Sequence, residues 1–161
     1  MKRTWLTALT VCFAASGLLL AAGPTKSSKA KWETKFEKAK EQAEEKGLPI
    51  LADFTGSDWC GWCIKLDEEV FSQKEFKEYA SENLVLFMAD YPRAKKQSAS
   101  EKKQNEELAQ KYSIQGFPTI LLLDAEGEVL ARTGYQPGGA EKYVEHIKKL
   151  IEENVKTEEE E

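Results

Sequence analysis

Two cysteines, Cys60 and Cys63, are the residues whose type and spacing most directly suggest chemistry. Because only two residues separate them, a small disulfide can close between their sulfurs without movement of the surrounding fold. An apolar run at 50–54 precedes the pair, and a segment whose composition suits a helix follows it at 64–71. We therefore expect a strand, a short loop and the start of a helix to meet at Cys60.

The start of a helix would change the reactivity of Cys60. Unsatisfied backbone N–H groups and a partial positive charge at a helix start favour a thiolate. The pKa of cysteine, about 8.5 in model peptides, falls to roughly 3.5–7.5 in two-cysteine motifs at helix N-termini. Cys63 lies one turn deeper and should be more shielded. We therefore expect Cys60 to attack and Cys63 to resolve.

The bulk properties of the chain predict one exported domain. Its 161 residues, 41% of them hydrophobic, suffice for one core. We expect a cleaved signal peptide at 1–23, a flexible linker at 24–31, the folded domain at 32–153 and an acidic tail at 154–161. An uncleaved membrane anchor is the alternative for the first segment.

Charge and cysteine usage narrow the function further. A formal net charge of −5 disfavours nucleic-acid binding. Removal of the signal would take Cys12 with it and leave Cys60 and Cys63 as the cysteines of a periplasmic or secreted protein, where disulfides persist. We expect a monomer that uses no cofactor and no metal.

Several motifs together make the chain similar to the thioredoxin family. They are Asp53-Phe54, Trp59-Cys60-Gly61-Trp62-Cys63, Gly116-Phe117-Pro118-Thr119, Gly127 and Gly134. The resemblance covers roughly residues 31–153 and is more specific than the cysteine pair alone. Among the subgroups, the chain is most similar to exported single-domain proteins and to the C-terminal domain of the membrane reductase that feeds periplasmic disulfide pathways. The resemblance implies an α/β thioredoxin fold, with helices on both faces of a central mixed sheet of four strands, or five.

Hydrophobic periodicity places the elements that must position these motifs. Apolar positions from Trp32 to Ala43 follow one helical stripe, which Gly47 ends. Short apolar runs at 50–55, 84–88 and 119–123 predict buried strands, of which the first two are parallel because a helix joins them. Further helices are expected from Ser72, which begins a capping-box pattern, from Glu101 and from Gly139, and a hairpin at 124–127 leads to an edge strand at 128–135.

Asp53 is unusual because it interrupts a strand expected to be covered on both faces, where desolvation would raise its pKa. The resemblance implies that it is the buried acid of thioredoxins, which helps the second cysteine lose its proton. The alternative is a strand-end aspartate bonded to backbone groups. Thioredoxins often carry a lysine nearby, and Leu86 takes that place here. We expect Ser57 or Asp58 to cap the helix that carries the cysteines.

The resemblance also assigns the client-binding residues. It implies that the Phe117–Pro118 peptide bond is cis, lies beside the cysteines and offers backbone hydrogen bonds to an extended client. A strand-entry proline on a sheet edge is the alternative. Trp59, Gly61 and Trp62 complete the candidates, and the two tryptophans either form an apolar rim or shield the disulfide from water. The connection at 91–100 is longer than usual, and we expect a solvated insertion there.

These residues together favour a thiol–disulfide oxidoreductase that reduces or isomerises disulfides of exported proteins. Reduced Cys60 would attack a client disulfide, and Cys63 would then release the reduced client. The expected partners are cysteine-containing exported proteins and an upstream thiol electron donor or acceptor, which a membrane protein could supply. The alternatives are a client-holding module in which redox activity is incidental, and delivery of Cu(I) by the two thiolates.

Overall fold

The computed structural model describes residues 31–158. The expected signal peptide at 1–23 and the expected linker at 24–31, except Lys31, therefore lie outside the described residues, as does the end of the expected acidic tail at 159–161. No helix within residues 31–158 is both long enough and apolar enough to cross a membrane.

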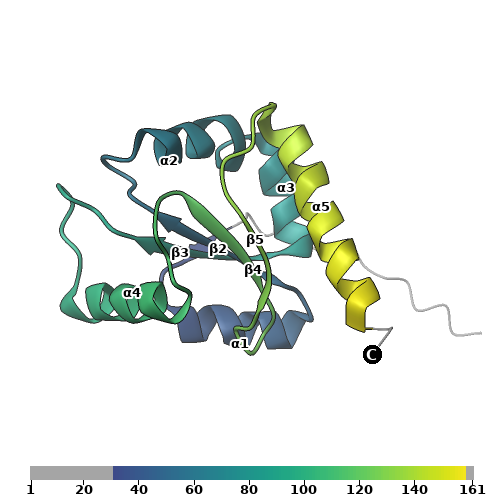
Figure 1. The fold of residues 1–161 in the computed structure, drawn as a ribbon, viewed down its shortest axis with the longest axis horizontal. Helices are drawn as coiled ribbons and strands as arrows, with labels where there is room; N and C mark the ends of the chain where they lie inside the picture. Colours follow the sequence, from purple (N-terminus) through teal and green to yellow (C-terminus); the bar gives the residue numbers. More distant parts are fainter. Residues whose placement is uncertain (1–30, 159–161) are drawn as a thin grey trace, which may run out of the picture.

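A five-stranded mixed sheet forms the centre of the molecule, in the order β1-β3-β2-β4-β5 (Figure 1). The strands are β1 Trp32–Glu33, β2 Ile50–Thr55, β3 Val85–Asp90, β4 Thr119–Leu123 and β5 Val129–Thr133. The first three are mutually parallel, β4 runs antiparallel to β2, and β5 runs antiparallel to β4. The predicted α/β fold is confirmed, with the sheet in its five-stranded form.

Helices cover both faces of this sheet. They are α1 Phe36–Lys46, α2 Gly61–Leu66, the π-helix η1 Asp67–Phe71 that continues α2, α3 Lys74–Asn83, α4 Ala99–Lys111 and α5 Gly139–Glu158. Figure 1 shows α1 and α4 on one face, and α2, α3 and α5 on the other. Two hydrophobic clusters, one in each layer between helices and sheet, form the core.

The pleat of β2 divides its residues between the two clusters. Leu51 packs with η1, α3 and α5, whereas Ala52 and Phe54 pack with α1 and α4. Every residue of β2 is buried, as the continuous apolar run predicted. The alternation places Asp53 on the same face of the sheet as Leu51, beneath the helix that carries the cysteines.

The first segment of the domain corrects the predicted helical stripe. Trp32 belongs to β1, where it pairs with Leu86 of β3 and its ring lies 5.1 Å from that of Phe71. The helix begins at Phe36, and Gly47 ends it in the left-handed conformation as predicted. Trp32 matched the helical spacing, but its backbone pairs with the edge of β3 instead, which would otherwise be an unpaired strand edge.

Three other helix boundaries differ from those predicted. The capping box at Ser72 does not form, because Gln73 is the N-cap of α3 and the Ser72 hydroxyl lies 3.1 Å from Oδ2 of Asp67. Helix α4 begins earlier than predicted, since Ser98 caps it by accepting the N–H of Glu101 at 3.2 Å. Helix α5 continues to Glu158, into the stretch expected as a tail.

The hairpin between β4 and β5 is fixed to the α1 and α4 layer through Gly127. Its φ of +86° is left-handed, and its carbonyl oxygen accepts the Tyr112 hydroxyl at 2.8 Å. A Cβ at this position would lie 3.2 Å from both the Phe36 ring and the Tyr112 hydroxyl oxygen. Gly47 has a similar φ of +62°, but a Cβ there would meet nothing within 4 Å.

These two glycines give a matched test of the packing under the hairpin. Gly47→Ala should lower the free energy of unfolding by about 1 kcal/mol, the cost of a left-handed alanine. Gly127→Ala should cost about 2–4 kcal/mol, because steric contacts with Phe36 and Tyr112 add to the same backbone cost. Urea denaturation measures both values. Equal losses in the two variants would contradict the close packing at Gly127.

Candidate active site

The two cysteines lie where β2 leads into α2. A turn after β2 is closed by the N–H of Cys60, which donates to the carbonyl oxygen of Gly56 at 2.9 Å. Cys60 is the N-cap of α2, and its Sγ accepts the N–H of Cys63 at 3.3 Å. The predicted meeting of strand, loop and helix start at Cys60 is confirmed. A sulfur in this position receives the backbone donors that stabilise negative charge.

The pair forms a disulfide, with 5.2 Å between the Cα atoms of Cys60 and Cys63. Cys60 is 8% exposed and Cys63 is 4% exposed, so Cys60 is the sulfur nearer to solvent. Trp62, between them in sequence, is 58% exposed. Gly61 has open space around its Cα, since a Cβ there would meet nothing within 4 Å. The more accessible Cys60 is therefore the better placed to meet another disulfide.

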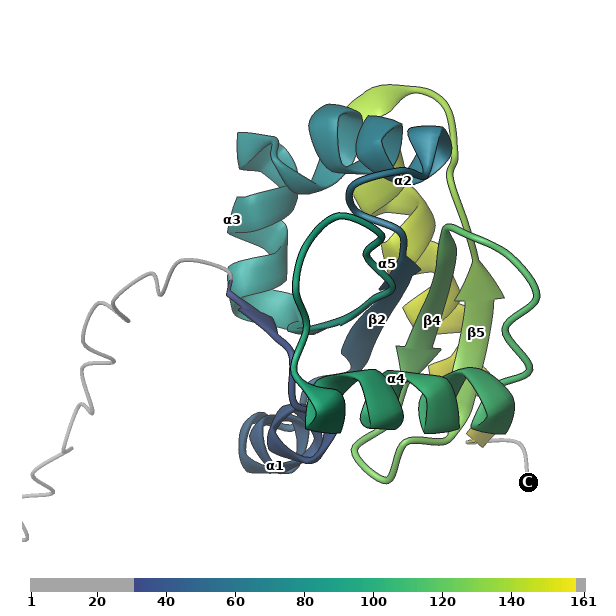
Figure 2. The ribbon, with the colours of Figure 1, turned by 90° about the vertical axis from the view of Figure 1, so that its left-hand side faces the viewer.

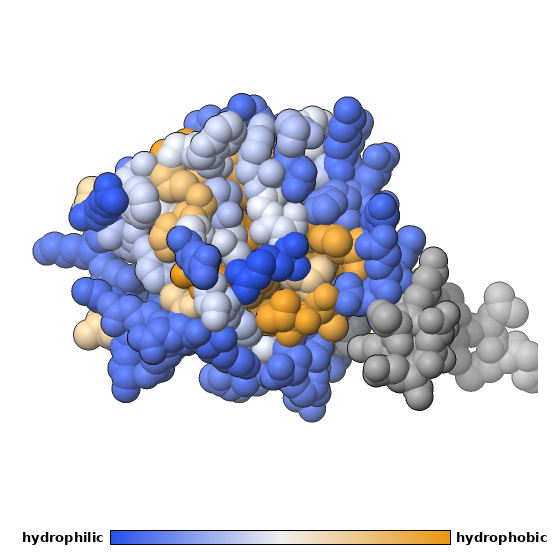
Figure 3. Space-filling view, in the orientation of Figure 1, coloured by the Kyte–Doolittle hydropathy of each residue, from blue (hydrophilic) through white to orange (hydrophobic). Residues whose placement is uncertain are grey.

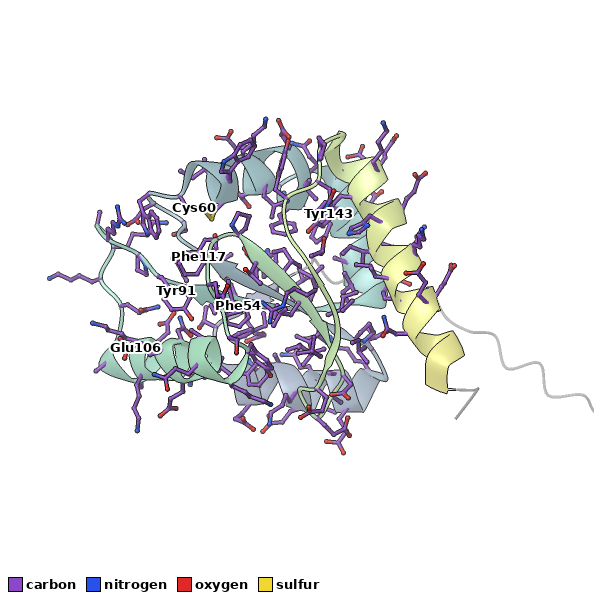
Figure 4. All side chains as sticks on the ribbon, in the orientation of Figure 1. Phe54, Cys60, Tyr91, Glu106, Phe117 and Tyr143 are labelled. Atoms are coloured by element: carbon purple, nitrogen blue, oxygen red, sulfur yellow. A yellow bond between two sulfur atoms is a disulfide. The ribbon has the colours of Figure 1, made fainter. Side chains whose placement is uncertain are left out.

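The Phe117–Pro118 peptide bond is cis, as the resemblance implied, and it immediately precedes β4. The Phe117 ring lies edge-on to the Trp59 ring, with centroids 5.9 Å apart, and 4.9 Å from the ring of Tyr91. Figure 4 shows Phe117 and Tyr91 at the same end of the molecule as Cys60. This aromatic cluster places the cis-proline segment next to the residue that precedes Cys60.

Asp53 lies beneath the disulfide and is 4% exposed. Burial, followed by the nearby charges of Asp67 and Asp90, raises the pKa of Asp53 to about 8. Its Oδ1 has no hydrogen-bond partner among residues 31–158. Asp53 and Cys63 both line one pocket, which places the acid behind the second cysteine.

The environment of Asp53 differs from the expected one in one respect. Its neighbour in β3 is Met88 rather than Leu86, which pairs with Leu51 two residues earlier in β2. No lysine of β3 therefore lies beside the carboxyl group. Instead Lys95, from the loop between β3 and α4, lines the same pocket.

Ser57 and Asp58 do not cap α2, which corrects the prediction. The Asp58 carboxylate accepts the backbone N–H groups of Arg93, Ala94 and Lys95 at 2.9, 2.7 and 3.0 Å. These hydrogen bonds hold the pKa of Asp58 below its ordinary value, and the bond from the Arg93 N–H has the largest effect. Ser57 donates its N–H and its hydroxyl to the Asp90 carboxylate at 2.9 and 2.6 Å. Cys60 caps the helix itself, which leaves both side chains to bind the neighbouring loop.

Trp59 is fixed in place on several sides. Its Nε1 donates to the carbonyl oxygen of Tyr91 at 2.8 Å, and the Arg93 guanidinium carbon lies 3.8 Å from its ring centroid. A Cβ at Gly56 would lie 2.5 Å from the ring, so no side chain fits there. The expected insertion thus has exposed side chains but a backbone bonded to the loop that precedes the disulfide.

Trp62 lies in a different environment from Trp59. Its ring lies 5.2 Å from that of Tyr135, and the ammonium of Lys65 is 5.3 Å from its centroid. Tyr135 in turn donates its hydroxyl to Glu69 at 2.7 Å. The sequence assigned no role to Tyr91, Arg93 or Tyr135. Tyr91 and Arg93 could have been noticed because they lie in the unusually long connection at 91–100. Tyr135 could have been noticed because it follows Gly134, one of the residues that carry the resemblance.

Within residues 31–158, no group of three or more His, Cys, Asp or Glu side chains could hold a metal ion. Nε2 of His146, on α5, lies 2.9 Å from the Thr133 hydroxyl oxygen.

Comparisons with known proteins agree with this geometry. A family model described as a thioredoxin-like domain matches residues 36–151. The chain is 37% identical over 128 residues to a Chlamydia pneumoniae protein named disulfide bond reductase DsbH, a match that covers 80% of this chain and 76% of the relative. A second protein of that organism, named thioredoxin-related protein DsbJ, is 31% identical over 103 residues, which are 64% of this chain and 30% of DsbJ. A solved structure titled DsbH oxidoreductase superposes with a TM-score of 0.74 at 36% identity, covering 83% of this chain and 92% of that one.

The raised pKa of Asp53 predicts how stability depends on pH. The folded protein keeps a proton that the unfolded chain releases between about pH 4 and pH 8, so stability falls as pH rises through this window. Asp53→Asn cannot titrate there. Relative to this variant, wild type should lose about 3–5 kcal/mol of stability between pH 4 and pH 8, since each pKa unit corresponds to about 1.4 kcal/mol. Urea denaturation of the oxidised proteins measures the difference, and a gap independent of pH would show that Asp53 ionises normally.

The Asp58 carboxylate should control the mobility of residues 93–96. Asp58→Ala removes the acceptor of three backbone N–H groups, so the segment should open more often. Limited trypsin digestion with mass spectrometry should show cleavage after Arg93, Lys95 or Lys96 accelerated about tenfold. Asp67→Ala, which changes a carboxylate outside this contact, is the matched control. The contact is unimportant if both variants are cut at the wild-type rate.

Proposed function

The chain belongs to the thioredoxin-like family, and from that premise we propose that it is a thiol–disulfide oxidoreductase that reduces or isomerises protein disulfides. The observation that carries the proposal is the disulfide between Cys60, the N-cap of α2, and Cys63, in a structure that also has a cis bond before Pro118. A structural disulfide normally closes a longer loop, whereas this one encloses two residues beside an aromatic cluster.

The reaction proceeds by two thiol–disulfide exchanges. In the reduced protein, the Cys60 thiolate attacks one sulfur of a client disulfide, and the other client sulfur leaves as a thiolate that takes a proton. Cys63 then loses its proton and attacks Sγ of Cys60, so that the client leaves with two thiols. Two electrons pass to the client, and the Cys60–Cys63 disulfide forms. Isomerisation follows when the client's own thiol resolves the mixed disulfide first.

Asp53 serves the second exchange as a proton acceptor. It lies beneath Cys63 and lines the same pocket. Its pKa of about 8 is close to that of an ordinary thiol, so a proton passes between the two groups without a large difference in free energy. The polar lining of the pocket, which includes Thr55, Ser57 and Asp90, supports relay of that proton towards solvent.

The client segment binds across the surface formed by Trp59, Gly61, Trp62, Phe117 and Pro118. Backbone hydrogen bonds to the residue before a cis proline suit an extended strand of any sequence. The lack of steric contacts at Gly61 supports a close approach to Cys60, and the exposed Trp62 offers an apolar contact. The Trp59 ring, which is held in place by Tyr91 and Arg93, forms one side of this surface.

The proposed partners are cysteine-containing exported proteins and an upstream thiol electron donor or acceptor. The names of the two Chlamydia pneumoniae relatives, a disulfide bond reductase and a thioredoxin-related protein, support a redox chain of this type. The periplasm or the cell exterior is the proposed location, because disulfides persist there.

A pair of serine variants tests this function. Cys63→Ser should accumulate a mixed disulfide between Cys60 and a client peptide, because the resolving sulfur is missing. Cys60→Ser should form no adduct and should lose disulfide reduction by a factor of at least about 1,000, as expected for removal of a nucleophile. Mass spectrometry of the trapped species and an insulin-reduction assay supply the measurements.

Two outcomes would contradict the oxidoreductase. Client binding that persists unchanged after both cysteines become serine, with no disulfide reduction by wild type, would favour a holding module. Stoichiometric Cu(I) retention by the reduced protein, again without disulfide reduction, would favour metal delivery.

A further inference from the structure

A loop of cationic side chains lies beside the candidate active site. It comprises residues 91–97 between β3 and α4 and is called the basic loop below, because it carries Arg93, Lys95 and Lys96. We propose that the basic loop selects client segments that carry aspartate or glutamate close to the cysteine being exchanged. This inference rests on the proposed function and adds a substrate preference to it.

The basic loop is held in one position relative to the disulfide. Three consecutive backbone N–H groups bind the Asp58 carboxylate, and the Gln97 side chain donates to the carbonyl oxygen of Asp90 at 3.0 Å. Lys95 Nζ lies 3.0 Å from the Ser57 hydroxyl oxygen. Each contact joins the loop to the turn before Cys60 or to the end of β3. The loop is therefore a fixed part of the site, and little entropy is lost when a client binds against it.

The charges on the basic loop are available to a partner. Within residues 31–158, neither Arg93 nor Lys96 forms an ion pair with a carboxylate, and both side chains are exposed. Lys65, in the last turn of α2, is instead 3.7 Å from Glu69. The Asp58 carboxylate is occupied by backbone donors. Two cations thus remain without a carboxylate partner on a chain whose formal net charge is −5.

Arg93 lies next to the expected path of the client. Its guanidinium carbon is 3.8 Å from the Trp59 ring centroid, and that ring contacts Phe117, whose backbone binds the client under the proposed function. Trp59 directly precedes Cys60. The side chains of Arg93, Trp59 and Phe117 therefore form a continuous row of contacts beside Cys60.

The views of the molecule agree with this arrangement. Figure 2 looks onto this end and shows the connection from β3 to α4 in front of the sheet and below α2. In Figure 3, hydrophobic surface appears below α2 in the left half, and hydrophilic side chains lie around it. Figure 4 labels Cys60, Phe117 and Tyr91 in that half. Arg93 adjoins the labelled Phe117 through the Trp59 ring, which contacts both side chains.

Carboxylates on the client would gain in rate of encounter and in binding. Charges at the edge of an interface act through water, so each pair contributes modestly and loses its effect in high salt. Two cations acting on two carboxylates should raise the rate of reduction about three- to tenfold at low ionic strength. The preference concerns residues beside the client cysteine, because both cations lie at one end of the protein.

The experiment compares the full reduced protein on three peptides. Each contains the same intramolecular disulfide, flanked by two glutamates, two glutamines or two lysines. Wild type should reduce the glutamate peptide about three- to tenfold faster than the glutamine peptide in 20 mM salt, and the lysine peptide most slowly. The ratio should approach one in 0.5 M salt, where the Debye length falls to about 4 Å. Ratios within one preparation do not depend on the fraction of active protein.

Three variants locate the effect. R93Q/K96Q should bring the glutamate-to-glutamine ratio close to one. K74Q/K149Q, which removes two exposed lysines from α3 and α5, changes net charge equally and should keep the wild-type ratio. Arg93→Lys keeps the charge without the planar stack on Trp59 and should also keep the preference.

Each result decides between distinct conclusions. A wild-type ratio of one in low salt overturns the proposed preference and leaves the oxidoreductase intact, because the peptides are still reduced. Equal loss of the ratio in K74Q/K149Q also overturns it, since net charge alone would then be the cause. If wild type reduces none of the three peptides, the proposed function fails and the preference fails with it.

Discussion

The position of β2 is the constraint on which the rest of this structure depends. The strand is hydrogen-bonded along both edges, to β3 and to β4, and every one of its residues is buried. Its end is therefore fixed, and the turn that follows delivers Cys60 to the start of α2 at one defined place. The same pleat sets Asp53 beneath Cys63, where the carboxyl group is almost fully buried. The reactive sulfurs and the buried acid are thus two consequences of one central strand.

Patterns within the sequence predicted much of this arrangement. The apolar run at 50–55 gave the bounds of β2, and two residues between the cysteines were enough to predict the disulfide. Gly47 was correctly taken as a helix end, because a left-handed residue with no Cβ is a local property. The cis bond before Pro118 was implied by resemblance, since proline alone favours the trans form.

What the sequence could not predict depends on contacts between distant segments. Trp32 fits a helical stripe, but the edge of β3 pairs with it. Asp58 has the side chain of a helix cap, yet Cys60 occupies that position and Asp58 accepts three N–H groups from a loop more than thirty residues away. Arg93 and Tyr91 lie in a polar connection, and only the fold brings them to Trp59. Hydrophobic periodicity within one segment gives no information about such contacts between segments far apart in the sequence.

The contact between Asp58 and the basic loop also affects how such a domain can diverge. A carboxylate that accepts three successive N–H groups fits one loop length and one backbone path. Insertions or deletions at 91–97 would leave it without donors, and loss of the acid would release the loop. The residue at position 58 and the length of the loop at 91–97 therefore depend on each other. In natural variants we expect the two to change together, while the central strand and the disulfide stay the same.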